Sequence, residues 1–317
     1  MYNLRMLFNK AGGLKIIKQY LLTGMWWRAP LILTTSGTSL KGLEIFRLVA
    51  NLCIYKYIKK KYWHALEMID YSKYSPEHNN SNKVWICWFQ GMENAPLVVR
   101  RCYESMKANL KNEEVILLTD NNIKDYVHFP EYILGKYERG VITKTHFTDL
   151  LRLELLINYG GTWIDSTVLC TGEIPDFIKQ SELFLYRELK PGLDGHSIAL
   201  SSWFIESTTN NKVLIAVREM LYDYWKKNNT LIDYFLLHIF LQLALEKYPE
   251  EEAKMVKVSN STPHILLLDI FKPYNKFLYE AIKKQTPIHK LAYKRSKEEM
   301  EKRGTYFDEI INKGNIL

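Results

Sequence analysis

The stretch DLLRLELLINYGGTWIDSTV, residues 149–168, predicts a buried helix, a tight turn and a short strand in direct succession. The apolar residues of the helix expected over about 145–158 are spread around its circumference, so hardly any polar face remains and the helix should be buried: Phe147, Leu150, Leu151, Leu153, Leu155, Leu156 and Ile157. The Gly160-Gly161 pair predicts the helix end and the turn, because glycine readily takes the left-handed conformation of helix caps. The strand expected over 162–164 then delivers Asp165 to its carboxyl end.

Charged residues interrupt this apolar helix. Asp149 and Arg152 are three residues apart and are therefore neighbours on one helix face. Charges in apolar surroundings are costly unless they are paired or used, so a structural ion pair and a ligand site are both open interpretations. Asp165 favours the ligand site, because the glycine turn can bring it beside the other two charges. Carboxylates can accept hydrogen bonds from sugar hydroxyls, and arginine can hold a hydroxyl or a diphosphate oxygen.

The segment before this stretch predicts a parallel sheet covered by helices. Residues 83–89 are rich in strand formers, a helix is expected over about 96–110, and a second strand is expected over 114–118. Ligands of such sheets bind beyond the carboxyl ends of the strands. Gln90 and the group 120–122 lie at those ends.

The order of these patterns resembles a known family. A D-x-x-R pattern, an apolar helix and a G-G-x-W-x-D-x-T pattern resemble the capsular polysaccharide synthesis family of bacterial glycosyltransferases. That family is related to the yeast mannosyltransferases that start outer chains and, more distantly, to the clostridial glucosylating toxins. Its second hallmark, W-x-x-G with a nearby proline, is similar to the stretch from Trp88 to Gly91 with Pro96. The resemblance covers residues 83–170 well and 195–270 loosely.

The resemblance implies an α/β fold of the GT-A (Rossmann-like) type, a nucleoside-diphosphate hexose donor and retention of anomeric configuration. Trp88 would stack on the uracil, although a tryptophan in a strand is commonly a core residue. Asp149 and Arg152 would bind the sugar, and Asp165 the ribose and the sugar, so these three are the predicted catalytic residues. The predicted donor-binding residues are Trp88, Gln90, Asn122, Asp149, Arg152, Asp165 and Thr167.

The pattern departs from that of related enzymes at the position expected to bind a metal ion. Related enzymes have Asp-x-Asp where this chain has Asp165-Ser166-Thr167, and a threonine is a poor ligand for a hard cation. Mn²⁺ or Mg²⁺ would therefore be absent or would rely on Asp165 and a later residue. His264 is the candidate, because GT-A enzymes often use a late histidine; the alternative is a loop histidine without a role.

Three later residues resemble family positions on the acceptor side: Trp203, Asp233 and His238. The pattern fixes no nucleophile. Retention without one suggests front-side attack, in which the leaving diphosphate takes the acceptor proton; the family implies this mechanism.

The chain has 317 residues with a formal net charge of +8, which favours an anionic partner. We expect a helical N-terminal segment over 1–80, a GT-A catalytic domain over 81–270 and a basic C-terminal helical segment over 271–317. From about residue 212 onward the chain is expected to be mainly helical, with an apolar run at 265–268 that predicts a strand. Scattered cysteines without a C-x-x-C pair predict free buried thiols.

The basic residues between 272 and 303 predict a contact with an anionic membrane, with Leu291 and Tyr293 dipping into the interface. No run of the sequence approaches the ~18 apolar residues of a membrane span. We therefore expect a cytoplasmic protein that is peripheral on the inner face of the plasma membrane.

Together these features predict a retaining hexosyltransferase of bacterial capsule or surface polysaccharide synthesis. The donor would be UDP-galactose or UDP-glucose, and the acceptor a saccharide linked to polyprenyl diphosphate. A sugar-phosphate transferase is the alternative among enzymes. A basic nucleic-acid-binding protein is the alternative of another class, but it leaves the Asp149, Arg152 and Asp165 array unexplained, and no nucleic acid is expected as a partner.

Overall fold

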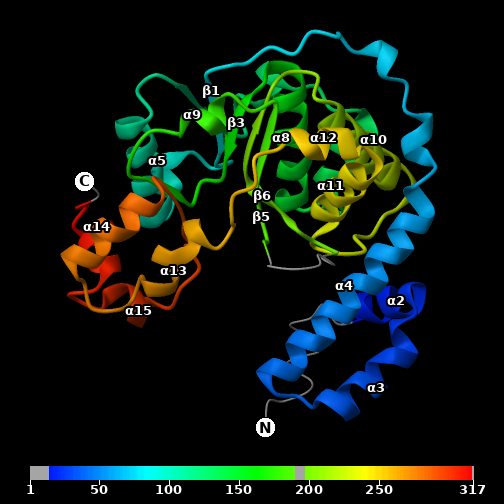
Figure 1. Cartoon of the computed structure of the whole chain (residues 1–317), viewed down its shortest axis with the longest axis horizontal. Coiled ribbons are helices and arrows are strands. Elements are labelled where there is room, and N and C mark those ends of the chain that lie inside the picture. The colour runs from blue at the N-terminus through cyan, green and yellow to red at the C-terminus, as the bar shows by residue number, and fades with distance from the viewer. Residues whose placement is uncertain (1–13, 190–196, 316–317) are drawn as a thin grey trace.

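The computed structural model describes residues 14–189 and 197–315, and its centre is a mixed β-sheet (Figure 1). The strands of this sheet lie in the order β2-β1-β3-β6-β5. They are β1 (Lys83–Cys87), β2 (Glu114–Leu118), β3 (Gly161–Ile164), β5 (Leu183–Arg187) and β6 (Leu200–Ser207). The first three are parallel, whereas β6 runs antiparallel to both β3 and β5. The predicted α/β fold class, with added helices before and after the sheet, is confirmed.

Helices cover both faces of the sheet because alternate strand residues point to opposite sides. Trp85 and Trp163 belong to the core on one side, under α8 (Lys144–Tyr159), α10 (Lys212–Lys227) and α11 (Leu236–Lys247). Val84 and Ile164 belong to the core on the other side, with Met106 of α5 (Leu97–Asn109). Shorter helices complete the domain: α6 (Ile123–Tyr126), α7 (Glu131–Glu138), α9 (Asp176–Lys179) and α12 (Pro249–Lys254).

The glycine pair after α8 sets the path into β3. Gly160 and Gly161 both have positive φ, 66° and 89°. A Cβ at Gly161 would collide with the backbone carbonyl oxygen of Lys83 in β1. The close approach of β3 to β1 therefore requires glycine here, and the predicted helix, turn and strand are confirmed.

The N-terminal helices form an arm that projects from the body (Figure 1). They are α2 (Leu14–Thr23), α3 (Met25–Ser36) and α4 (Leu40–Tyr62). The second half of α4 is anchored in the main core by Ile54, Ile58 and Tyr62, all at most 1% exposed. We call α2, α3 and the first half of α4 the helical arm. Within the described part of the chain, no helix is both long and apolar enough to span a bilayer.

The residues after 264 form a separate lobe, coloured orange to red in Figure 1. This C-terminal lobe contains α13 (Ile265–Asp269), α14 (Lys276–Gln285), β7 (Ile288–Lys290) and α15 (Lys297–Glu301). The strand predicted at 265–268 is wrong: the run is helix α13, in which only Leu266 is buried. The strand in this region is instead β7, which pairs antiparallel with β4 (Val168–Cys170) of the main domain.

Candidate active site

The carboxyl ends of the three parallel strands meet at one edge of the sheet, where the predicted donor residues lie. Asp165 directly follows β3. The segments after β1 and β2 stay hydrogen-bonded to each other, since the amide of Trp88 donates to Leu118 and that of Asp120 to Phe89. The placement of these segments at one edge is therefore confirmed.

Asp149, Arg152 and Asp165 come together as predicted. Arg152 Nη2 lies 3.2 Å from Asp149 Oδ1, and Arg152 Nη1 lies 3.8 Å from Asp165 Oδ1. The side chains of Asp149 and Arg152 are only 10% and 5% exposed, whereas that of Asp165 is 29% exposed. Asp165 is therefore the member of the array that solvent or a ligand can reach best.

Arg152 is fixed by several partners besides the two carboxylates. Its Nε donates to the Thr148 carbonyl at 3.2 Å, its Nη1 donates to the Ser202 carbonyl, and its guanidinium lies 4.8 Å from the centroid of the Trp163 ring. A planar group with several N–H donors can satisfy all these contacts at once. The orientation of the guanidinium is thus set by backbone and ring together.

His146 completes the array, and the sequence analysis missed it. Its Nδ1 donates to Asp149 Oδ2 at 3.2 Å, and the ring is buried. His146 lies one helical turn before Asp149, so the H-x-x-D spacing on a buried helix could have revealed it. Both oxygens of Asp149 are engaged, one by Arg152 and the other by His146, which indicates a positioning role.

Lys290 is the second residue that the sequence analysis missed. Its Nζ donates to Asp165 Oδ2 at 2.9 Å and to Thr167 Oγ1 at 2.7 Å. Burial acts to raise the pKa of Asp165, but the positive charges of Lys290 and Arg152 outweigh it and hold that pKa below its ordinary value. Asp165 is therefore ionised at neutral pH, with a cation on each side.

The donor atoms around Asp165 do not fit a resident divalent cation. They comprise one carboxylate and the Thr167 hydroxyl, and the ammonium of Lys290 already bridges the two. The described residues contain no group of three or more His, Cys, Asp or Glu side chains placed to hold a metal. His264 donates through Nδ1 to the Asn260 carbonyl at 2.7 Å and packs edge-on against Trp203. Its part in metal binding stays a prediction.

The residues predicted to hold the nucleoside differ in their exposure and in whether their side chains are already hydrogen-bonded within the protein. Trp88 is half-buried, and its Nε1 has no hydrogen-bond partner among the described residues. Asn122 accepts from the Thr119 amide and donates to the Leu117 carbonyl, so its side chain stabilises the turn after β2. Gln90 is exposed in the turn that follows β1.

Tyr293 packs edge-to-face on Trp88, with 5.6 Å between the ring centroids. The expectation that Leu291 dips into a membrane is wrong, because Leu291 is 3% exposed and belongs to the core of the C-terminal lobe. Lys290 likewise faces Asp165. This part of the basic segment therefore covers the sheet edge.

The three acceptor-side residues occupy different surroundings. Trp203 is buried and stacks on Tyr186 with 4.8 Å between the ring centroids, which gives it a packing role. Asp233 accepts from Gln19 Nε2 of the helical arm at 3.3 Å. Nδ1 of His238 is buried without a partner among the described residues. Burial lowers the pKa of His238 to about 4, and the Asp149 and Arg152 charges act on it, so this neutral imidazole lies near the charged array.

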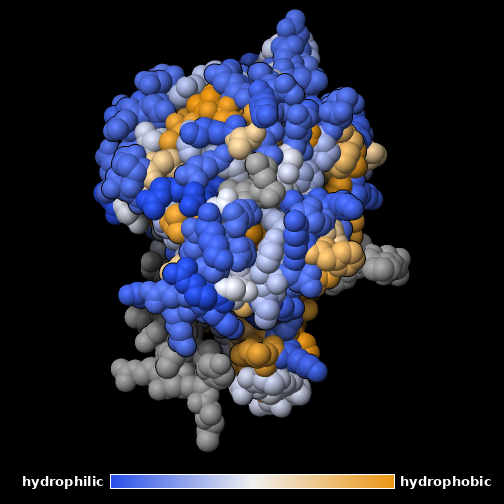
Figure 2. Space-filling model, turned by 90° about the vertical axis from the view of Figure 1, so that its left-hand side faces the viewer, coloured by the Kyte–Doolittle hydropathy of each residue, from blue (hydrophilic) through white to orange (hydrophobic). Residues whose placement is uncertain are grey.

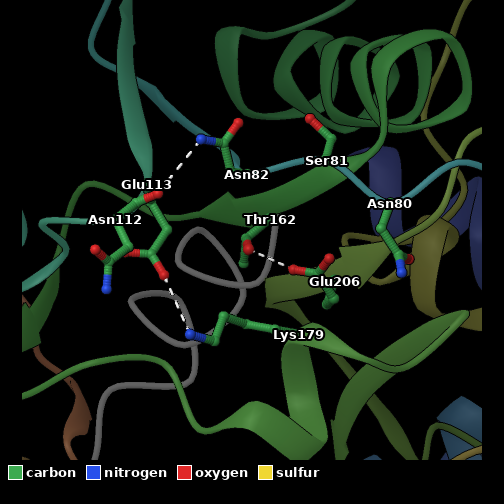
Figure 3. Close-up of a pocket in the computed structure, with 8 residues that line it drawn as sticks. All are labelled: Asn80, Ser81, Asn82, Asn112, Glu113, Thr162, Lys179 and Glu206. Atoms are coloured by element: carbon green, nitrogen blue, oxygen red, sulfur yellow. Dashed lines mark hydrogen bonds and ion pairs between the residues drawn. The ribbon is translucent and has the colours of Figure 1, made fainter.

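A polar cavity of about 300 Å³ lies at the opposite edge of the sheet (Figure 3). Thr162 and Glu206 pair across β3 and β6 near the start of β3, and the Thr162 hydroxyl donates to Glu206. Across the cavity, Glu113 pairs with Lys179 at 3.5 Å. Because this cavity lies at the amino ends of the parallel strands, it is separate from the Asp165 edge.

The chain is similar to known proteins at three levels. A family model described as "Capsular polysaccharide synthesis protein" matches residues 41–310. The O-glycosyltransferase braB of Annulohypoxylon truncatum is 26% identical over 164 residues, which make up 46% of this chain and 38% of that protein. The chain thus matches well under half of that relative's length. The solved structure of the PaToxG glycosyltransferase is 14% identical, with a TM-score of 0.37 over 83% of this chain and 98% of that chain.

Proposed function

Because the chain belongs to the capsular polysaccharide synthesis protein family, we propose that it is a glycosyltransferase of capsule or surface polysaccharide synthesis. The family resemblance drawn from the D-x-x-R and G-G-x-W-x-D-x-T patterns is confirmed by this match. The donor in this proposal is UDP-galactose or UDP-glucose, and the hexose is transferred with retention. One observation carries the proposal: Asp165, at the carboxyl edge of the sheet, is ionised, partly exposed and held between Arg152 and Lys290.

The charged side chains of the array differ in exposure and in their partners, and we assign them different roles on this basis. Asp165 is the most open, so its carboxylate is the group that accepts hydrogen bonds from hydroxyls of the donor. Asp149 is engaged by both His146 and Arg152, and it acts by holding them in place. Arg152 retains N–H groups beyond its backbone contacts, and these stabilise Asp165 and face the donor sugar.

Retention in this proposal follows from front-side attack. The acceptor hydroxyl oxygen bonds to the anomeric carbon on the face from which UDP departs. The bond between that carbon and the β-phosphate oxygen breaks, its electron pair stays on the phosphate, and that phosphate takes the acceptor proton. The protein then has to position both substrates and stabilise the departing negative charge, which is the largest catalytic contribution in many enzymes.

The proposed acceptor is a saccharide linked to polyprenyl diphosphate at the cytoplasmic face of the membrane. The helical arm supports it, because Gln19 of α2 contacts Asp233 on the predicted acceptor side. The same arm exposes large apolar side chains, including Trp26, Trp27 and Leu31, which are 60%, 50% and 59% exposed. An arm that rests on lipid would bring the membrane beside this side of the site.

The test is donor turnover by the purified chain and by one variant. We expect release of UDP from UDP-galactose or UDP-glucose, and a loss of at least about 100-fold in Asp165→Asn, which keeps the shape but removes the charge. Asp176→Asn is the matched control, since the Asp176 side chain is 82% exposed on α9. Equal turnover by Asp165→Asn and the parent would remove Asp165 from the reaction. Release of UMP in place of UDP would favour a sugar-phosphate transferase.

A further inference from the structure

We infer that Lys290 is the resident cation of the donor site and replaces the divalent metal in stabilising the leaving diphosphate. The inference rests on the proposed glycosyl transfer. Its basis is the bridge that Lys290 Nζ makes to Asp165 Oδ2, at 2.9 Å, and to Thr167 Oγ1, at 2.7 Å. These are the first and third residues of the Asp165-Ser166-Thr167 turn, the two positions that are both aspartate in metal-binding relatives. A positive charge thus already stands where the metal would.

The backbone holds Lys290 firmly in this position. Lys290 is the last residue of β7 and pairs with Val168 at the start of β4. The next amide, that of Leu291, donates to the Thr167 carbonyl at 2.8 Å. Thr167 at the end of the turn and Val168 directly after it are therefore tied to the strand that carries Lys290. The Lys290 side chain is only 17% exposed. The ammonium cannot leave Asp165 and Thr167 without giving up both hydrogen bonds in a largely buried place.

The substitution of threonine for the second aspartate matches this arrangement. Two carboxylates with a divalent metal have a net charge of zero, and so do one carboxylate and one ammonium. The two kinds of site are therefore equal in net charge. A metal added between Asp165 and Thr167 would instead meet Lys290 at close range, where like charges repel strongly in partly buried surroundings. Thr167 also provides only a neutral oxygen to a hard cation. The site therefore favours the ammonium over the metal.

The ammonium can do part of the chemistry of the metal. It has three N–H donors, of which Asp165 and Thr167 take two, so one remains for a phosphate oxygen. Lysine is an effective phosphate ligand as a point charge. As the bond between the anomeric carbon and the β-phosphate oxygen breaks, that oxygen gains negative charge. The remaining N–H and the charge of Lys290 stabilise it until the acceptor proton arrives.

Metal dependence of donor hydrolysis provides the first test. The purified chain is treated with EDTA, and UDP release is compared before and after addition of Mn²⁺ or Mg²⁺. We expect kcat to change less than about two-fold, and Lys290→Ala to lose at least about 100-fold in kcat, as for removal of one preorganised donor. Lys297→Ala is the control, because the Lys297 side chain is 85% exposed and pairs with Glu301 at the surface. Activity that EDTA abolishes and Mn²⁺ restores would overturn the inference.

A gain-of-function variant provides the second test and guards against misfolding. Lys290→Ala combined with Thr167→Asp removes the ammonium and supplies the second carboxylate. We expect this double variant to bind Mn²⁺ in calorimetry in the presence of UDP and to release UDP only when Mn²⁺ is present. The parent should not bind Mn²⁺ in the same experiment, and it should release UDP with or without Mn²⁺. Mn²⁺ binding by the parent as tight as by the double variant would contradict the inference. If the parent releases UDP only with metal, the inference about Lys290 is overturned and the proposed function is retained. If the parent releases no UDP from any donor, with or without metal, both the inference and the proposed function are overturned.

Discussion

The ring of Tyr293 meets the ring of Trp88 edge to face, with 5.6 Å between the centroids. Tyr293 belongs to the C-terminal lobe, and Trp88 directly follows the first strand of the sheet. Three residues before Tyr293, Lys290 reaches Asp165. The lobe therefore touches the sheet edge at two points, one on the predicted nucleoside side and one on the predicted sugar side. It would thus form one wall of the proposed donor site.

This contact predicts how the two rings share donor binding. If Trp88 stacks on the uracil, Trp88→Ala should raise the KM for the UDP-sugar about 5- to 150-fold, since base–aromatic stacking contributes about 1–3 kcal/mol. Tyr293→Ala should raise it by less, because Tyr293 only supports the orientation of the Trp88 ring. In both variants kcat should change little. Calorimetry with UDP alone gives the binding constant, and an unchanged constant in Trp88→Ala would make Trp88 a packing residue.

The surroundings of Arg152 predict that lysine cannot replace it. One ammonium cannot reach Thr148, Ser202 and Asp149 together, so Arg152→Lys should lose at least about 100-fold in kcat/KM although the charge is kept. Arg218→Lys is the matched control. Arg218 is also buried and paired at 3.3 Å with a carboxylate of α8, that of Glu154, and its other hydrogen-bond partners among the described residues are Glu219 and Tyr74.

The two arginine variants separate a structural from a functional role. Thermal unfolding should show a similar fall in melting temperature for both, because each replaces a buried guanidinium and leaves some of its hydrogen-bond partners unsatisfied. Turnover measured below both melting temperatures should fall strongly only in Arg152→Lys. A parallel fall in both variants would make Arg152 a structural cation.

The features that could be predicted from the sequence are local ones. The helix before Gly160, the turn and the strand that carries Asp165 follow from residues that are neighbours in the chain. Lys290 could not be found in this way, because it lies 125 residues from Asp165 and reaches it only through the pairing of β7 with β4. Long-range strand pairing depends on the whole fold, and no local pattern encodes it.

Two other differences have similar causes. The run 265–268 is apolar but too short for its periodicity to distinguish a strand from a helix, and its place outside the sheets makes it helical. Strands β5 and β6 were not predicted, although they are buried along their whole length. His146 could have been predicted from the sequence, because its spacing from Asp149 places both residues on one face of a buried helix.

The polar cavity at the opposite edge predicts a pH effect on stability. Burial raises the pKa of Glu206 from 4.5 to about 8, despite the hydrogen bond from Thr162. Between these two values the folded state holds a proton that the unfolded state has lost, so the free energy of unfolding falls as pH rises. The slope from this group is at most about 1.4 kcal/mol per pH unit.

Glu206→Gln should remove this dependence, because the amide stays neutral and keeps a similar shape (Figure 3). We expect the variant to be more stable than the parent at pH 8 and closer to it at pH 4.5, as measured by urea unfolding at both values. Glu182→Gln is the control, since Glu182 pairs with Lys254 at the surface and its side chain is 54% exposed. A parent whose stability is flat from pH 4.5 to 8 would show that Glu206 titrates normally.

The last prediction concerns membrane binding. The structure favours the helical arm, and not the basic C-terminal segment, as the surface that binds the membrane. Changing Lys290, Lys294 and Arg295 to Glu would not test lipid binding alone, because Lys290 is paired with Asp165. Figure 2 shows the side of the molecule that carries the C-terminal lobe, where hydrophilic residues cover most of the surface. The helical arm has the more apolar surface: Leu21, Leu22, Trp26, Trp27, Leu31, Leu40, Ile45, Leu48 and Leu52 are all at least 40% exposed.

The arm combines the features of an interfacial anchor. Trp27 and Leu31 are four residues apart on α3, and Ile45, Leu48 and Leu52 recur at helical spacing on α4, so each helix presents an apolar face. Tryptophan rings favour the boundary between lipid and water, and nearby basic residues such as Arg28 and Lys41 favour anionic lipid.

We therefore expect the chain to sediment with phosphatidylglycerol vesicles and to lose this binding when Trp26, Trp27 and Leu31 are changed to Ser. The loss should be roughly 100-fold, since the three side chains together contribute about 3 kcal/mol of apolar burial. The same change at Leu268, Phe277 and Leu278, which are exposed on the C-terminal lobe, is the matched control and should leave binding intact. Donor hydrolysis should survive both sets of changes, because neither set touches the Asp165 edge. If only the change on the C-terminal lobe abolishes vesicle binding, the membrane-binding surface lies on that lobe. If the change on the helical arm abolishes self-association of the chain and leaves vesicle binding intact, the apolar faces of the arm join two copies of the chain.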